Sequence, residues 1–243
     1  MGEQVKVYRN LQFLGNANHT RNVEGNMNPD RIFREWNFKE LALDETNQYT
    51  KFIDTTSAVA LANGGITLTT AATNTKTCSY AFGGIHLLAA KNPYVEFKFQ
   101  LDDITNVAIN AVLTDAVTEA SGVLPFLISG TTISDTATDG VGFCFDTEQT
   151  TDRWYAVRTT AGTQTGQLLS AVQAPFAAAT DLTLGIEMDT LANASFFLNG
   201  VQVWYKTVAV TADNPLVPYL GIRNNSATAH VMTPRYVRLW EDA

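Results

Sequence analysis

Cysteine and histidine are scarce in this chain. It contains two cysteines and three histidines among 243 residues, with no Cys-x-x-Cys spacing and no histidine beside either cysteine. A zinc site needs three or four converging nitrogen or sulfur ligands, so the sequence indicates no such site. Cys78 and Cys144 lie in separate apolar stretches, which is typical of buried free thiols.

Positive charge and long apolar runs are also lacking. The chain has 16 basic and 24 acidic residues, a net charge of −8, and no cluster of lysine and arginine. The electrostatic field therefore disfavours a polyanion, and we expect no nucleic-acid partner. No apolar run approaches the roughly 18 residues of a membrane span, and the first residues lack the apolar core of a secretory signal. These absences predict a protein made in a cytosol with no membrane partner.

The motifs of nucleophilic catalysis are missing as well. The sequence has no G-x-S-x-G elbow, no phosphate-cradling glycine loop and no Cys/His pair in a recognisable setting. What the sequence does contain is a clear β-hairpin. Asn199-Gly200 accepts the positive φ of a type I′ turn between two alternating runs. Folding there predicts three pairs on one face: Leu198 with Val201, Phe196 with Val203, and Ala194 with Tyr205.

From about residue 57 the sequence alternates strand after strand. Residues 94–101, 107–113 and 182–189 each place apolar side chains on one face and more polar ones on the other. This pattern, without alternating helices, predicts an all-β, antiparallel two-sheet jelly-roll sandwich over residues 56–243. Residues 1–55 show no such period and are interpreted as an irregular N-terminal arm. A capping asparagine followed by proline predicts one short helix in the arm, over about 29–36.

The order of these features resembles a known domain. The segments that carry the resemblance are 140–158, 182–189, the hairpin at 196–200, 218–222 and 236–240. Together they resemble the concanavalin A-like (laminin-G-like) jelly-roll domain, especially the versions found in structural proteins of tailed bacteriophages. The resemblance covers roughly residues 57–243. Its motifs are architectural, so it speaks more strongly for fold than for function.

Acidic residues supply the one candidate for catalysis. Glycosidases of this fold carry acids along one strand as Glu-x-Asp-x-x-Glu or a version one residue shorter. Glu187 and Asp189 supply two of these acids on one face, but the third is missing at both spacings. Geometry does not exclude the pair, because hydrolysis needs two carboxyl groups about 5–9 Å apart. Solvent-facing acids opposite a core stripe are nevertheless ordinary, so we assign no catalytic residue from the sequence.

Acidic loops supply the candidates for metal binding. They are Asp102 with Asp103, and the group Asp146, Glu148 and Asp152. Loop carboxylates of β-sandwiches can bind calcium, but this spacing matches no defined calcium loop. The sequence therefore assigns no cofactor and no metal ligand, and loop-bound calcium remains an alternative to solvated acids.

Aromatic residues supply the candidates for an interface. Phe197 and Trp204 are predicted on the hairpin face opposite the core stripe, where they could pack within the chain, join a subunit interface or stack on a sugar. The arm carries aromatics that a disordered tail would lack, among them Phe33, Trp36 and Phe38. They are expected to pack on the β-domain, on a neighbouring subunit or on a shell beneath.

These observations lead to a functional expectation. The sequence is interpreted as a non-enzymatic virion structural protein, a phage capsid decoration or cement protein at the virion surface. Its expected partners are the major capsid protein or other virion proteins and further copies of itself. The alternative is a carbohydrate-binding module or tail-borne receptor-binding protein with a glycan ligand. A polysaccharide hydrolase acting through Glu187 and Asp189 ranks last.

Overall fold

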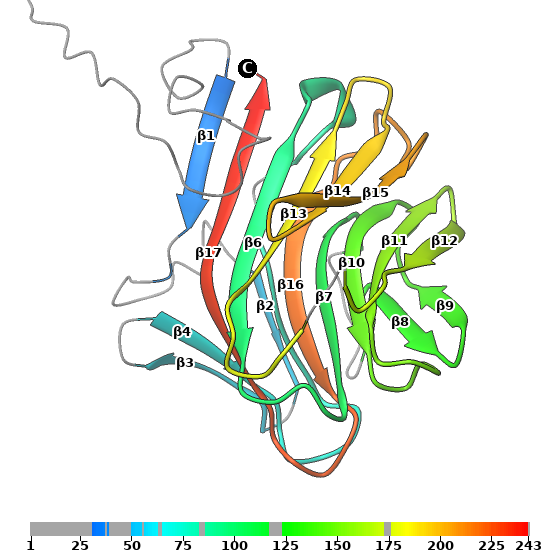
Figure 1. Ribbon diagram of the computed structural model, residues 1–243. Helices are drawn as coiled ribbons and strands as arrows, with labels where there is room; N and C mark the ends of the chain where they lie inside the picture. Colours follow the sequence, from blue (N-terminus) through cyan, green and yellow to red (C-terminus); the bar gives the residue numbers. More distant parts are fainter. Residues whose placement is uncertain are drawn as a thin grey trace, which may run out of the picture.

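The protein is a sandwich of two antiparallel β-sheets (Figure 1). The computed structural model describes residues 31–36, 38, 50–54, 56–62, 65–82, 86–116, 123–172 and 176–242. Their one helical element is a 3-10 turn, η1 (Ala89–Lys91), and no helix in this part of the chain is long and apolar enough to cross a membrane. The all-β jelly-roll prediction is confirmed.

The first sheet, sheet A, has eight strands. In spatial order they are β15 (Val201–Lys206), β14 (Ala194–Leu198), β13 (Leu182–Met188), β6 (Tyr94–Leu101), β17 (Val231–Asp242), β4 (Gly65–Thr69) and β3 (Ala58–Ala62), with β1 (Arg31–Trp36) also paired to β17. The long strand β17 pairs with β4 near its start and with β1 along its second half, as Figure 1 shows.

The second sheet, sheet B, has seven strands. In spatial order they are β12 (Thr163–Leu168), β11 (Trp154–Thr160), β10 (Gly140–Asp146), β7 (Val107–Thr114), β16 (Val217–Asn224), β5 (Thr77–Ala81) and β2 (Thr50–Ile53). A separate hairpin, β8 (Phe126–Ser129) and β9 (Thr132–Asp135), contacts β10 and β12.

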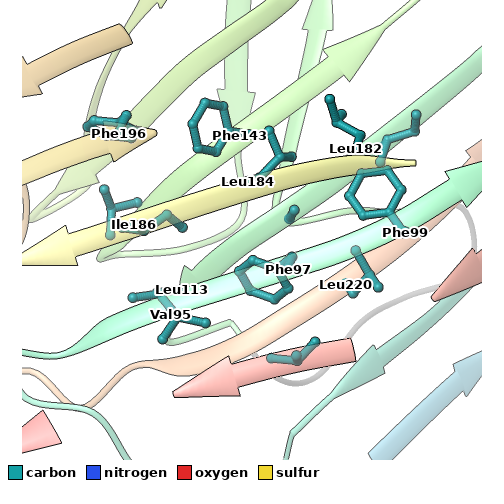
Figure 2. Close-up of a cluster of buried hydrophobic side chains, with 14 of the residues drawn as sticks. Val95, Phe97, Phe99, Leu113, Phe143, Leu182, Leu184, Ile186, Phe196 and Leu220 are labelled. Carbon is teal, nitrogen blue, oxygen red and sulfur yellow. The ribbon is translucent and has the colours of Figure 1, made fainter. Parts of the chain in front are cut away.

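The core lies between the two sheets and follows from the alternation along each strand. On β6, Val95, Phe97 and Phe99 point inward, and Figure 2 shows them with Leu184 of β13 and Phe143 of β10. These side chains are fully buried. Since apolar burial is the main favourable term in folding, this two-sided packing selects the register of every central strand.

The outer face of sheet B is closed by the β8–β9 hairpin. Asn110 of β7 holds Phe126 at both its backbone groups: its Nδ2 donates to the Phe126 carbonyl at 2.9 Å, and its Oδ1 accepts the Phe126 N–H at 2.7 Å. Asp146 of β10 accepts the Ile128 N–H at 3.0 Å. Phe126 and Ile128 then bury a second apolar cluster on this face. Over this part of sheet B the outer surface is therefore packed.

Two segments of the predicted arm are strands. Residues 31–36 form β1 rather than a helix, which corrects the helix predicted over about 29–36; residues 29 and 30 lie outside the described residues. The local capping signal is outweighed by pairing with β17, where Phe33 lies opposite Trp240 with ring centroids 5.0 Å apart. Residues 50–53 form β2 at the edge of sheet B. Segments of the arm thus extend both sheets.

The Asn199-Gly200 hairpin is confirmed at its turn and corrected beyond it. Both turn residues have positive φ, and Leu198 pairs with Val201 as predicted. A β-bulge between Phe196 and Phe197 then shifts the register, so that Phe196 faces Trp204 rather than Val203. A bulge places two residues of one strand against one of its partner, which turns Trp204 to the core side of the sheet.

Candidate functional site

A row of residues crosses the outer face of sheet A. Strand pairing places Trp240 of β17 opposite Tyr94 of β6, and Tyr94 opposite Glu187 of β13. Glu187 lies opposite Ser195 of β14, which in turn lies opposite Tyr205 of β15. Because residues paired directly across neighbouring strands point to the same face, these five side chains share one side of the sheet.

A depression of about 340 Å³ lies at one end of this row. Its acidic lining residues are Glu187, Asp189 and Asp242. The remaining lining residues are uncharged: Asn92, Met188, Asn193, Ser195 and Tyr205. Residues from four strands of sheet A and from the turns beside them therefore converge on one acidic hollow.

Asn92 and Asp242, which both line the depression, are joined by a hydrogen bond. Asn92 follows η1 in a left-handed conformation, with φ of 45°, which asparagine tolerates better than most residues. Its Nδ2 donates to Oδ2 of Asp242 at 2.6 Å, a link between residues 150 positions apart in the chain. This bond fixes the end of β17 against the start of β6 and orients the Asp242 carboxylate.

Asp189 ties the turn between β13 and β14. Its Oδ1 accepts the backbone N–H groups of Leu191 and Asn193, each at 2.9 Å, and its Oδ2 accepts Nδ2 of Asn193 at 2.8 Å. Partial burial raises the pKa of Asp189, but these hydrogen bonds outweigh burial and hold the pKa below its ordinary value. Asp189 is therefore an ionised, positioned carboxylate and unsuited to donate a proton.

The substitution Asp189→Asn should destabilise the protein in a pH-dependent way. A lowered pKa stabilises the folded state above the unfolded value of about 3.9, and this contribution is lost as pH falls below it. We expect a loss of about 1 kcal/mol in the free energy of unfolding at pH 7, discounted for exposure, and a smaller loss at pH 3. Urea unfolding of both proteins at the two pH values measures this. A loss of equal size at both would contradict the role of the charge.

Aromatic rings pack beside the depression rather than open to solvent. Tyr94, Phe197 and Trp240 form a buried cluster, with Tyr94 and Trp240 centroids 5.3 Å apart. The ring of Tyr94 lies over Gly185, where an added Cβ would come within 2.6 Å of the tyrosine oxygen. Glycine at this position of β13 therefore makes room for the tyrosine that adjoins Glu187.

The five aromatic residues proposed from the sequence all pack within the described chain. Phe197 belongs to the cluster with Tyr94, and Phe33 contacts Trp240. Trp204 packs on Phe196 with centroids 4.8 Å apart, on the core side and not on the outer face as predicted. Trp36 and Phe38 both contact the ring of Phe82, at 5.3 and 6.0 Å between centroids.

The loop acids and the cysteines have other surroundings. Asp146 is fully buried, which raises its pKa, and it accepts hydrogen bonds from Ile128, Glu148 and Asn225. Within the described ranges, no three His, Cys, Asp or Glu side chains gather where they could hold a metal ion. The two cysteines are buried free thiols in separate clusters, and burial raises the pKa of Cys78 to about 12.

Sequence reasoning found Glu187 and Asp189 but missed Asn92, Asp242 and Tyr205. Asp242 and Asn92 carry no local motif, and they meet only because β17 pairs with β6. Tyr205 was predicted on the core side with Ala194, and the bulge at Phe196 moves it to the outer face opposite Ser195. A register shift caused by a β-bulge of this kind leaves no recognisable pattern in a single sequence.

Comparison with known proteins gives structural matches only. No protein-family model and no curated protein matches the sequence. The catalytic domain of an endo-1,3-beta-glucanase (laminarinase) from Thermotoga petrophila superimposes with a TM-score of 0.60 at 12% identity, covering 86% of this chain and 96% of that one. LamAcat from Zobellia galactanivorans gives 0.61 at 9% identity, covering 88% and 99%. Bacillus licheniformis beta-glucanase gives 0.58 at 12%, covering 85% and 97%.

Several of the neighbouring structures are named as glucanases or glycosidic hydrolases. They support the concanavalin A-like jelly roll and correct the functional interpretation of the sequence. A non-enzymatic virion structural protein, and with it a capsid decoration role, is contradicted by matches to beta-glucanases over most of the chain. The error arose because the order of strands is shared by everything built on this fold and does not distinguish its functions. The expected capsid partner, self-association and virion location stay predictions from sequence.

Proposed function

We propose that this protein hydrolyses a polysaccharide, and that it does so in the depression lined by Glu187, Asp189 and Asp242. The observation that carries the proposal is that these three acidic residues line one depression on the outer face of sheet A. Glycoside hydrolysis uses a pair of carboxyl groups on either side of the scissile bond. The likeness in fold to beta-glucanases adds support.

Of the three acids, Glu187 and Asp242 are the pair assigned to catalysis. Asp189 is ruled out as proton donor because its oxygens hold the turn between β13 and β14. Glu187 and Asp242 lie on strands separated by β6, and both line the same depression. Glu187 is in register with Trp240, two inter-strand spacings away, and Asp242 lies two residues further along β17. The backbones of Glu187 and Asp242 are therefore roughly 12 Å apart across the sheet, a gap that their side chains narrow.

The roles follow from the surroundings of each group. Asp242 accepts a hydrogen bond from Asn92, which orients its carboxylate. This carboxylate either takes a proton from the attacking water or itself attacks the anomeric carbon. Glu187 is the remaining acid, and it gives its proton to the glycosidic oxygen as the bond to the anomeric carbon breaks. Water supplies the hydroxyl of the new reducing end, and its second proton restores the acid. NMR of the first-formed product shows whether its anomeric configuration is inverted or retained. Inversion means that Asp242 activates water, and retention means that Asp242 attacks the anomeric carbon directly.

The test is release of reducing ends by the purified protein. The substrates are a β-1,3-glucan, a mixed-linkage β-1,3-1,4-glucan and mucin O-glycans, the classes named for the neighbouring structures. We expect new reducing ends from at least one of them, in proportion to protein concentration. Folded protein that releases none from any of the three would overturn the proposal.

A further inference from the structure

Tyr205 stands apart from the other aromatic residues on the outer face of sheet A. Its side chain is 49% exposed, lies at the edge strand β15 and lines the acidic depression. Tyr94, Phe197 and Trp240 on the same face are buried among one another. The ring of Tyr236 is covered by the Arg238 guanidinium, 4.0 Å from its centroid. Of these aromatic side chains, Tyr205 is the one with a ring open to a ligand in the depression.

Two exposed apolar residues are hydrogen-bonded through their backbone N–H groups to residues that line the depression, Leu191 to Asp189 and Val208 to Asn193. Leu191 is 73% exposed in the turn after β13, and Val208 is 59% exposed just after β15. Asn193 joins the two segments. Its Oδ1 accepts the Val208 N–H at 3.1 Å, and its Nδ2 donates to Oδ2 of Asp189. The segment after β15 is thus bound to the same turn that carries Asp189.

The conformation of Val208 shows that this segment is held under constraint. Val208 has φ of 48°, a left-handed conformation that is unusual for a β-branched residue. Hydrogen bonds hold the segment there, from the Ala209 N–H to the Ala192 carbonyl at 2.7 Å and from Thr160 Oγ1 to the Ala209 carbonyl. Strained residues kept in place by their surroundings cluster at ligand-binding sites.

We propose that Tyr205 stacks on a sugar ring in a subsite next to the cleavage point, with Leu191 and Val208 as its apolar rim. This inference rests on the proposed function. A sugar ring presents C–H groups to an aromatic face and hydroxyl groups at its edge, which suits Tyr205 beside Ser195 and Asn193. The row from Tyr205 to Glu187 crosses two inter-strand spacings, roughly 10 Å, so the saccharide chain enters over the edge of β15 and runs across the strands.

The occupant is a saccharide that carries no negative charge. The residues lining the depression include three acids and no lysine or arginine. A uronate or sulfate group bound there would meet three acidic residues and no basic residue among those that line the depression, and like charges repel. Tyr205 and the carboxylates together therefore favour a neutral chain over an acidic one.

The test uses the full chain carrying Glu187→Gln, which leaves a bound saccharide uncut. Calorimetric titration with hexasaccharides of β-1,3- and of β-1,4-linked glucose gives Kd for this protein and for three double variants, with Tyr205→Ala, Tyr205→Phe or Val201→Ala added. Val201 is the matched control, 55% exposed on the same strand but paired with Leu198 at its far end. We expect Tyr205→Ala to raise Kd roughly tenfold and Tyr205→Phe and Val201→Ala to change it less than twofold.

Three results would overturn the subsite. The first is that Tyr205→Ala and Val201→Ala change Kd equally. The second is that a hexasaccharide of galacturonic acid binds more tightly than the neutral hexasaccharides. The third is that the Tyr205→Ala variant sediments as a monomer where the parent protein sediments as a dimer. The last would assign Tyr205 to a subunit contact. Hydrolysis by the wild-type protein is assayed separately. If saccharide binding depends on Tyr205 but the protein releases no reducing ends, the subsite is retained and hydrolysis is rejected. If the protein releases reducing ends but binding does not depend on Tyr205, hydrolysis is retained and the subsite is rejected.

Discussion

The Glu187→Gln variant is expected to lose between about 10²- and 10⁴-fold in the rate of reducing-end release. Glutamine preserves the size and hydrogen-bonding capacity of the side chain but has no proton to give to the leaving oxygen. Since the loss falls on the chemical step, kcat should drop while KM changes little. Initial rates at saturating and limiting concentrations of whichever glucan the wild-type protein cleaves measure both quantities.

A matched control for this variant is Glu35→Gln on β1. Glu35 accepts Nε–H of Arg238 at 2.8 Å and lies outside the depression, so its loss removes a surface ion pair but no catalytic group. An exposed pair of this kind contributes at most about 1 kcal/mol to stability. We expect wild-type activity from Glu35→Gln. Equal rates for the wild-type protein and Glu187→Gln would remove Glu187 from the mechanism.

The Trp154→Ala variant is expected to lose about 3–5 kcal/mol in the free energy of unfolding. Trp154 begins β11, is fully buried and contacts four phenylalanine rings across the two layers. Those rings are Phe99, Phe143, Phe145 and Phe176, with centroids 5.1 to 6.4 Å from that of Trp154. Removing the indole leaves a cavity that rigid strands cannot close. Urea unfolding followed by circular dichroism measures the loss.

The Trp154→Phe variant separates packing from hydrogen bonding at the same position. Among the described residues, Nε1 of Trp154 has no hydrogen-bond partner, so replacing the indole with a phenyl ring breaks no bond. The expected loss is less than half that of Trp154→Ala, because most of the aromatic volume remains. Equal losses for the two variants would show that the indole N–H, and not the ring volume, stabilises the core.

The strand pattern of the sandwich could be predicted because burial acts on single strands. On β6, apolar and polar residues alternate from Tyr94 to Leu101, and the structure buries the predicted set of Val95, Phe97 and Phe99. The turn at Asn199-Gly200 was equally readable, since positive φ is a local property that few residue types accept. Both signals lie within a few residues of the chain.

Pairings between distant segments could not be predicted in the same way. The stretch 31–36 carries a local helix signal, yet it is a strand because the second half of β17 has room for a partner. The bulge at Phe196 reverses the faces expected for Trp204 and Tyr205. In each case the energy that decides comes from contacts with residues far away in sequence, and a single chain does not display them.

Residues within single segments were enough to predict an antiparallel β-sandwich, its principal strands, the Asn199-Gly200 turn and the absence of the common nucleophile and zinc motifs. The surroundings of Glu187 could not be predicted in this way, because Asn92, Glu187 and Asp242 come from parts of the chain that meet only when β17, β6 and β13 pair. Alternation along a strand reports which face is buried, and it carries no information about which strands become neighbours. The candidate site depends on that adjacency.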